Sequence, residues 1–179
     1  MAVKAPTKKL RGVLKHINPK LKFDRKPFDK NTLGKFKADI AYVSSRGRSR
    51  ARYLYTTDSQ GRIKTVIADP LILKKSGRAR SSYTYQNPTG KTAVDDSGHL
   101  IADRFDGAGS RENIISQLSS TNQGAWKDME QLWADALNAT PPKSVKVNIE
   151  IQYGTGGRPT GFLVTEWVDG LRRVNVYTN

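Results

Sequence analysis

The chain has 179 residues, of which 36% are hydrophobic and 26% charged, a composition typical of a single soluble globular domain. It contains no cysteine and only two histidines, which excludes disulfides and zinc sites built from Cys and His. The formal net charge is +15, and the sequence shows neither a conventional signal peptide nor an apolar run long enough to cross a membrane.

The positive charge lies almost entirely in the first half of the chain. Residues 1–90 contain 22 Lys and Arg against 5 Asp and Glu, a net of +17, whereas residues 91–179 contain 9 against 11, a net of −2. This asymmetry predicts that one part of the molecule meets a polyanion, either nucleic acid or an acidic protein.

Residues 1–37 are rich in lysine and are interrupted by Pro19, Pro27 and Gly34. We interpret them as a basic N-terminal extension, irregular or short-helical, that wraps a single domain at residues 38–179 or is partly mobile. A solvated basic tail is the alternative.

The segment RGRSRAR follows a predicted strand and precedes another. If it is extended, its alternating arginines share one face and form a row suited to phosphates; the residues are Arg46, Arg48, Arg50 and Arg52. An exposed arginine-rich loop is the equally favoured alternative. The next stretch, RYLYTTDSQGRIKTVIA, predicts a hairpin because two aromatic or β-branched runs flank the turn residues DSQG.

The strongest predicted helix covers residues 122–138, where apolar residues recur at spacings of three and four before Pro141 and Pro142. Asn122 stands at the N-terminal end of the buried face. It is therefore either a helix N-cap or a ligand for water or a metal ion.

Alternating residues at 145–153 predict a strand, and residues 160–178 predict a hairpin around Asp169-Gly170. The class is α+β with a mostly antiparallel sheet, and 153–159 is interpreted as a flexible link.

His99 lies in DDSGHLIADRFDG, a segment rich in turn-forming residues. Neutral histidine accepts a proton from water near neutral pH, and arginines and amides bind phosphodiesters. Hard divalent cations with oxygen ligands carry charge on phosphoryl oxygens. Such side chains follow closely along the chain, which favours phosphodiester cleavage; they are Arg104, Arg111, Asn113, Gln117, Asn122 and Gln123. His16 has only lysines around it and is predicted to be a surface residue.

The segment SGHLIADRFDGAGSRENIISQLSSTNQGAWKDMEQLWADAL resembles the core of the non-specific DNA/RNA endonucleases, which are His-Me finger or ββα-metal nucleases. The similarity covers about residues 94–137 and is greatest to the bacterial branch of DNA-entry nucleases and toxin nuclease domains. The resemblance implies a hairpin that carries the histidine, followed by a helix that carries the metal ligand.

The same resemblance implies roles for individual residues. His99 matches the general base, and Asn122 matches the ligand of a single Mg²⁺ (or Mn²⁺) whose other ligands are mostly water. Glu130 matches a glutamate that supports this water shell, although a solvated helical glutamate is the alternative. Asn113 and Gln117 match amides that organise the site.

The chain reads Asp96-Ser97-Gly98-His99 where many family members read Asp-Arg-Gly-His. Arg104 is the candidate that replaces the missing arginine in holding phosphate, and Arg111 is a further candidate for binding nucleic acid.

The leading hypothesis is a Mg²⁺-dependent endonuclease that cleaves DNA, with RNA left open, without sequence preference. The resemblance further implies a toxic domain delivered into the cytoplasm of a target bacterium and blocked by an acidic immunity protein, with no membrane partner. The rival hypothesis is a basic nucleic-acid-binding protein without catalysis, in which His99 and Asn122 are structural.

Overall fold

A computed structural model describes residues 3–29, 35–76, 79 and 85–179. In this part of the chain one eight-stranded sheet has the order β1-β3-β4-β5-β8-β9-β10, with β2 paired to β3. All its pairs are antiparallel except β2 with β3. The strands are β1 (Val3–Lys4), β2 (Lys22–Phe23), β3 (Ile40–Ser44), β4 (Tyr53–Thr57), β5 (Ile63–Ala68), β8 (Val145–Tyr153), β9 (Pro159–Val168) and β10 (Leu171–Thr178). The predicted α+β class is confirmed.

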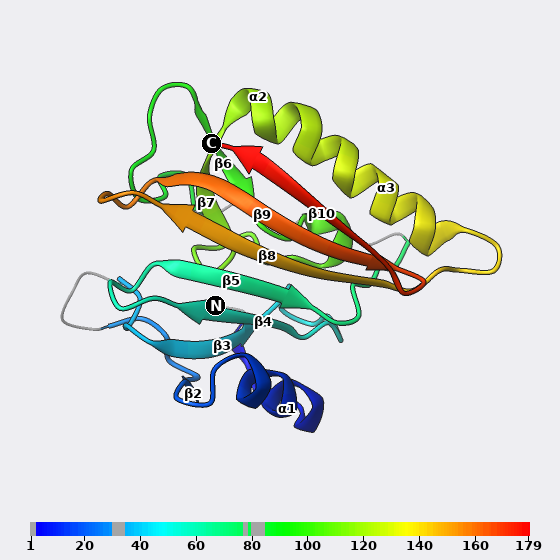
Figure 1. Cartoon of the computed structure of the whole chain (residues 1–179), viewed down its shortest axis with the longest axis horizontal. Coiled ribbons are helices and arrows are strands. Elements are labelled where there is room, and N and C mark those ends of the chain that lie inside the picture. The colour runs from blue at the N-terminus through cyan, green and yellow to red at the C-terminus, as the bar shows by residue number, and fades with distance from the viewer. Residues whose placement is uncertain (1–2, 30–34, 77–78, 80–84) are drawn as a thin grey trace.

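The elements between β5 and β8 form a separate unit against the sheet. A two-stranded ribbon consists of β6 (Asp95–His99) and β7 (Ile114–Leu118), and the short 3₁₀ helix η1 (Asp103–Phe105) lies between them in sequence. A helical run follows β7 directly, with the segments α2 (Ser119–Thr121), η2 (Asn122–Trp126) and α3 (Lys127–Asn138). Figure 1 shows this run along one side of the sheet, opposite α1 (Lys8–Ile17).

The sheet separates two apolar clusters. The larger one joins the sheet to α3, the ribbon and η1, and Trp126, Trp133, Phe105 and Phe162 are fully buried in it. The smaller one lies under α1, where Leu10 and Leu14 pack on residues of β3, β4 and β5. Burial of these large aromatic side chains stabilises the packing of η1 and the helical run on the sheet.

The described part of the N-terminal extension is folded onto the domain. β1 pairs with β3, and α1 covers the sheet after Thr7 caps its first turn by accepting a hydrogen bond from the Leu10 N–H. Its apolar side faces the sheet and its lysines face solvent, as expected of an amphipathic surface helix. Gly34, one of the predicted interruptions, lies outside the described residues.

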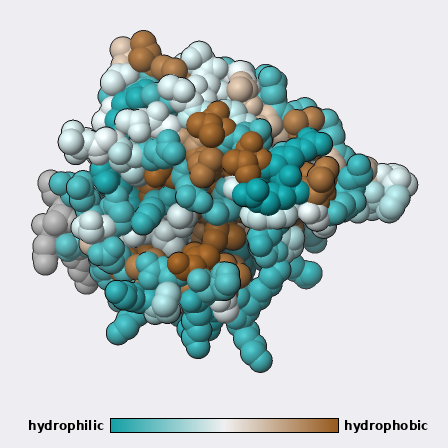
Figure 2. Space-filling model, in the orientation of Figure 1, coloured by the Kyte–Doolittle hydropathy of each residue, from teal (hydrophilic) through white to brown (hydrophobic). Residues whose placement is uncertain are grey.

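Both predicted hairpins are present. Strands β4 and β5 flank the turn at Asp58–Gly61, and β9 and β10 flank Asp169-Gly170, where both turn residues have positive φ. Figure 2 shows hydrophobic residues on the visible face of the molecule, and some of them lie over β9 and β10. The exposed apolar side chains of β10 are Leu171, Val174 and Val176.

Candidate active site

The β6–β7 ribbon carries the histidine. His99 is the last residue of β6, its Cα pairs with that of Ile114, and its side chain is half-buried. Asp96, Ser97 and Gly98 are residue types that favour turns, but all three are paired in the strand. The hairpin that the family resemblance implies around the histidine is therefore confirmed.

A close contact with Gln117 explains the glycine before the histidine. A Cβ atom added at Gly98 would lie 2.1 Å from Gln117 Oε1 and 2.8 Å from its Cβ. Gln117 is 1% exposed, and neither amide atom has a hydrogen-bond partner within the described residues. Only glycine leaves room for this side chain beside the strand that carries His99.

Asn113 organises the connection between the two strands. Its Oδ1 accepts hydrogen bonds from the Tyr55 hydroxyl (2.7 Å) and the Ile101 N–H (3.0 Å). Its Nδ2 donates to the carbonyls of Ile101 and Ala108, both at 2.8 Å. The side chain is fully buried and all these bonds stay inside the protein, so its geometry is that of a residue that shapes the loop after His99.

Asn122 does not cap the helix. The helical run begins at Ser119, and Asn122 itself has helical backbone angles (φ −62°, ψ −44°). The backbone is kinked two residues later, at Gly124. The N-cap alternative is therefore wrong, because the first turn of the run precedes Asn122.

An aspartate that the sequence analysis did not select holds this amide. Asp96 Oδ2 accepts hydrogen bonds from Asn122 Nδ2 (2.8 Å) and Gln123 Nε2 (2.9 Å), and Oδ1 accepts one from the Ser119 hydroxyl (2.9 Å). These bonds, that from Asn122 foremost, hold the pKa of the Asp96 carboxyl below its ordinary value. The signal was present in the sequence, since Asp96 matches the first residue of the family's Asp-Arg-Gly-His pattern.

The contact with Asp96 also fixes which end of the Asn122 amide faces outward. An ionised carboxylate only accepts hydrogen bonds, so the NH₂ group must face Asp96 and the carbonyl oxygen must point away. No donor among the described residues bonds that oxygen. Amide oxygen is a hard ligand of the kind that Mg²⁺ accepts, and the site therefore fits the ion that the resemblance implies.

No group of three or more His, Asp or Glu side chains in the described ranges is arranged to hold a metal ion. A site with one amide ligand and several waters does not need such a group, because Mg²⁺ gives up its water ligands reluctantly.

Glu130 lies two helical turns after Asn122 and is half-buried. Burial raises the pKa of its carboxyl to about 7, an effect that the Trp126 indole and the Arg104 guanidinium only partly offset. The alternative of an ordinary solvated glutamate is therefore not supported. Arg104 is exposed and donates to Gln131 Oε1 (2.9 Å), so η1 and α3 are joined beside this carboxylate.

The four arginines between β3 and β4 do not form an extended row. Their segment is a turn in which Ser49 is buried and donates to Asp106 (2.6 Å). The alternating arginines therefore do not share one face, as they would in an extended segment. Arg46 forms an ion pair with Asp103 (3.3 Å), and Arg52 donates to backbone carbonyls of its own loop. Arg48 and Arg50 are exposed. The loop alternative describes the structure.

Arg111 is half-buried between aromatic rings. Its guanidinium lies 5.4 Å from the centre of the Phe28 ring and 5.1 Å from that of Tyr85. It precedes β7 and so lies near the strand partner of His99.

The model of one protein family matches residues 43–170, and its description is "DNA/RNA non-specific endonuclease". The chain belongs to this family. Its domain is therefore of the endonuclease type that the resemblance over residues 94–137 had indicated.

Relatives of the chain include a protein of a bacterial secretion system and a probable deoxyribonuclease. The type VII secretion system protein EssD of Staphylococcus aureus is 34% identical over 152 residues, which cover 81% of this chain. The probable deoxyribonuclease RhsA of Dickeya dadantii is 31% identical over 110 residues, which cover 61% of this chain. The matched parts make up only 24% and 8% of those two proteins.

Solved structures of NucA from Streptococcus agalactiae, one without metal and one with magnesium bound, share the fold of the endonuclease. Their TM-scores are 0.55 and 0.54 at 19% identity, and the match covers 97% of this chain and 89% of NucA. In the described part of the endonuclease, no helix is both long and apolar enough to span a membrane.

Proposed function

We propose that this endonuclease hydrolyses DNA, and RNA as a second substrate, with Mg²⁺ as cofactor and without sequence preference. The observation that carries the proposal is the contact of Asn122 with Asp96, which turns an amide oxygen outward from the helix that follows the His99 ribbon. The magnesium-bound NucA structure and the name deoxyribonuclease given to RhsA support the choice of ion and substrate.

In the proposed reaction, the imidazole of His99 takes a proton from a water molecule, whose oxygen attacks phosphorus. The P–O3′ bond breaks, the 3′-oxygen takes up a proton from solvent to leave as a hydroxyl, and the phosphate stays on the 5′ end, as the family resemblance implies. When bound at Asn122, Mg²⁺ would offset the negative charge that develops on the phosphoryl and leaving oxygens. Arg104, on the surface of η1, contacts a phosphate of the bound strand. Glu130 would accept hydrogen bonds from water ligands of the bound ion.

A plasmid assay tests this proposal. Supercoiled plasmid and a labelled RNA are incubated with the protein and Mg²⁺, with and without EDTA, next to His99→Ala and His16→Ala. His16 is exposed on α1 and serves as the matched histidine control. Cleavage should stop with EDTA, fall at least ~10²-fold in His99→Ala and stay unchanged in His16→Ala. Tight binding without any cleavage by the wild type would favour the non-catalytic alternative.

We further propose that the chain is the toxic domain of a delivered bacterial effector, neutralised by an acidic immunity protein in the cell that makes it. EssD and RhsA support this, as does the +17 charge of residues 1–90, which would steer an acidic partner onto the nuclease. Expression in the bacterial cytoplasm should be toxic, and His99→Ala should remove the toxicity. Harmless high-level production of folded, active enzyme would contradict the proposal.

A further inference from the structure

A cleft of about 410 Å³ opens beside the ribbon that carries His99. Five separate segments line it: 35–36, 60–63, 85–89, 111–115 and 153–157. Its size is in the range of small-molecule sites and is sufficient for one nucleotide. Figure 1 shows the β8–β9 hairpin tip and the β4–β5 turn, which contribute two of these segments, at the same end of the sheet.

The cleft borders the end of the ribbon that carries the catalytic histidine. Ile114 and Ile115 of β7 both line the cleft, and the Cα of Ile114 is paired with that of His99. Side chains of directly opposed residues in an antiparallel pair project to the same face, with their Cβ atoms about 5 Å apart. A ligand that contacts Ile114 would therefore lie close to the imidazole.

The lining combines cations with aromatic rings. The cations are Lys35, Arg62 and Arg111, the rings are Phe36, Tyr85 and Tyr153, and no Asp or Glu is among the described residues that line the cleft. The Arg62 guanidinium lies 4.4 Å from the centre of the Tyr153 ring, and Arg111 lies 5.1 Å from that of Tyr85. Aromatic and guanidinium planes stack with bases, and neighbouring cations bind phosphates.

One wall is held rigidly before any ligand arrives. Arg62 donates to Asp58 Oδ2 (2.7 Å) and to the carbonyls of Gly154 (3.2 Å) and Gly156 (2.9 Å). The Tyr153 hydroxyl donates to the Ile63 carbonyl (2.8 Å). Residues 153–159, interpreted from the sequence as a flexible link, are therefore fixed to the β4–β5 turn. A preformed wall lowers the entropy cost of binding.

We propose that this cleft binds one unpaired nucleotide of the substrate strand, next to the phosphate that is cleaved. The base stacks between the Arg62–Tyr153 and Arg111–Tyr85 pairs, and its phosphate contacts Lys35. This inference rests on the proposed function. Because a paired base is covered by its neighbours in the stack, only single-stranded segments can use the cleft.

Binding measurements on non-cleaving protein test the proposal. In a His99→Ala background with EDTA, anisotropy of a labelled 12-nucleotide DNA strand gives the Kd for single strand and for the duplex of the same sequence. Tyr85→Ala should weaken single-strand binding about 5- to 100-fold, the usual effect of losing one base stack, and duplex binding less than about 2-fold. Tyr85→Phe retains the ring and should bind as the background protein does.

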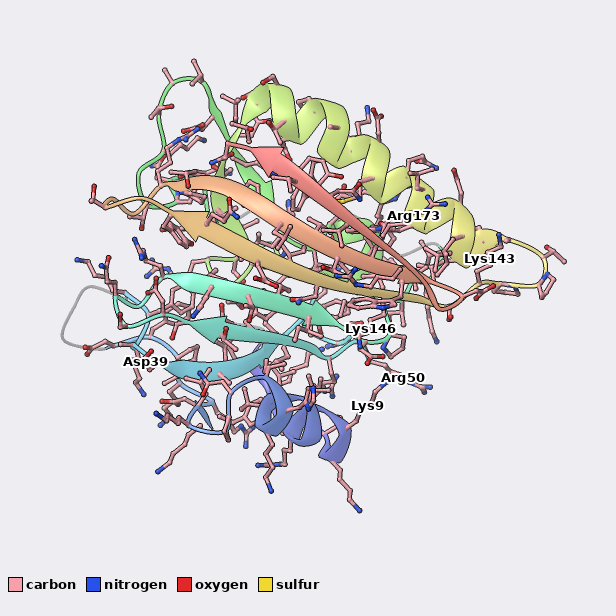
Figure 3. All side chains as sticks on the ribbon, viewed as in Figure 1. Lys9, Asp39, Arg50, Lys143, Lys146 and Arg173 are labelled. Carbon is pink, nitrogen blue, oxygen red and sulfur yellow. The ribbon has the colours of Figure 1, made fainter. Side chains whose placement is uncertain are left out.

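Two further variants control for charge and for folding. Lys143→Ala removes a cation at the end of the molecule opposite the β8–β9 tip (Figure 3) and should affect single strand and duplex equally. Thr155→Glu places a negative charge in the cleft at an exposed position and should reproduce the selective loss even if Tyr85→Ala fails to fold.

Equal weakening of single-strand and duplex binding by Tyr85→Ala and Thr155→Glu would overturn the proposal, and so would no weakening of either. The outcome is separable from that of the plasmid assay. If the wild type cleaves but the cleft substitutions leave single-strand binding unchanged, only the proposed role of the cleft is refuted. Cleft-dependent binding by a protein that never cleaves would refute only the nuclease mechanism.

Discussion

Asn122 owes its orientation to one carboxylate, and this separates its two candidate roles. A helix cap satisfies backbone N–H groups, whereas the Asn122 side chain donates to Asp96 from inside a helix that begins three residues earlier. The carboxylate thus turns the amide oxygen away from itself, as the proposed role in holding Mg²⁺ requires.

Asn122→Ala should lower cleavage at least ~10²-fold and raise the Mg²⁺ concentration needed for half-maximal rate, while leaving the melting temperature nearly unchanged. Asp96→Asn should raise the Mg²⁺ concentration needed for half-maximal rate by roughly 10- to 100-fold, as is usual when a group that orients a metal ligand is lost. Metal titrations of activity paired with thermal melts check both. A loss of about 1 kcal/mol of stability with full activity in Asn122→Ala would restore the capping role.

The glycine before His99 permits a second prediction at the scale of one residue. Gly98→Ala must move the buried Gln117 or the strand itself, so it should destabilise the fold by about 1–3 kcal/mol and reduce cleavage by displacing the imidazole. Gly12→Ala is the matched control, because an added Cβ meets nothing within 4 Å in α1 and should stabilise the helix by up to about 1 kcal/mol. Urea melts and plasmid assays on both variants would decide, and a fully stable, active Gly98→Ala enzyme would contradict the packing argument.

Among the elements, the ribbon is tied to the sheet by one buried ion pair. The Asp95 side chain is 0% exposed and accepts two hydrogen bonds from Arg158, from Nη2 at 2.5 Å and Nε at 2.8 Å, with further bonds from Thr92. The Arg158 guanidinium foremost, with Thr92, holds the pKa of the Asp95 carboxyl well below its ordinary value. The ion pair connects β6 to the start of β9 and thereby holds His99 relative to the sheet.

This ion pair predicts a pH dependence of stability. A carboxyl whose folded pKa is depressed stabilises the protein at pH values above its unfolded pKa of about 3.9, and this contribution is lost as the pH falls toward the folded pKa. Asp95→Asn should therefore lower the free energy of unfolding by about 1–3 kcal/mol at pH 7, because Arg158, whose side chain is 25% exposed, loses a charged hydrogen-bond partner but keeps its contact with solvent. The difference from wild type should shrink below about pH 4. Urea unfolding of both proteins at pH 7 and pH 3 measures it, and an equal difference at the two values would exclude the ion pair as its source.

Elements with a regular apolar pattern were predictable from the sequence, because local periodicity determines them. The helix at 127–138 and the hairpins around Asp58–Gly61 and Asp169-Gly170 are examples. The ribbon was not predictable from residue types, since Asp96, Ser97 and Gly98 favour turns and are held in a strand by tertiary contacts. Only the resemblance to known nucleases indicated it.

The contacts of the site could be predicted only in part, for a similar reason. His99 and Asn122 carry a spacing that the family shares, but the partners of Asn113 and Asn122 come from segments distant in sequence. The prediction of an extended row of arginines was wrong because a buried hydrogen bond between Ser49 and Asp106, which are 57 positions apart, holds that segment as a loop. Periodicity within a segment carries no information about such contacts.

On the scale of the whole molecule, part of the basic charge of residues 1–90 is paired with carboxylates of the same chain. Arg46 and Lys74 both contact Asp103, and Lys9 contacts Asp69. Cations that are paired internally contribute less to binding a polyanion than exposed ones, because their charge is already compensated.

The salt dependence of nucleic-acid binding should therefore respond differently to arginines of the same loop. For duplex DNA, log Kobs falls with log[salt] with a slope of about −0.9 for each phosphate that the protein neutralises. Replacing the exposed Arg48 and Arg50 by Glu should reduce the magnitude of the slope by about 1.8, without changing the preference between unrelated sequences. Arg46→Glu should instead lower the melting temperature, because it puts a like charge against Asp103. It should change the slope by less than the value of about 0.9 expected for one phosphate contact. The slopes are measured by titrating labelled duplex with the His99→Ala protein at several KCl concentrations, and each variant is checked by a thermal melt. If Arg46→Glu lowered the slope as much as the exposed pair does while leaving the melt unchanged, the ion pair with Asp103 would not hold in solution, and all the arginines of the loop would be available to phosphate.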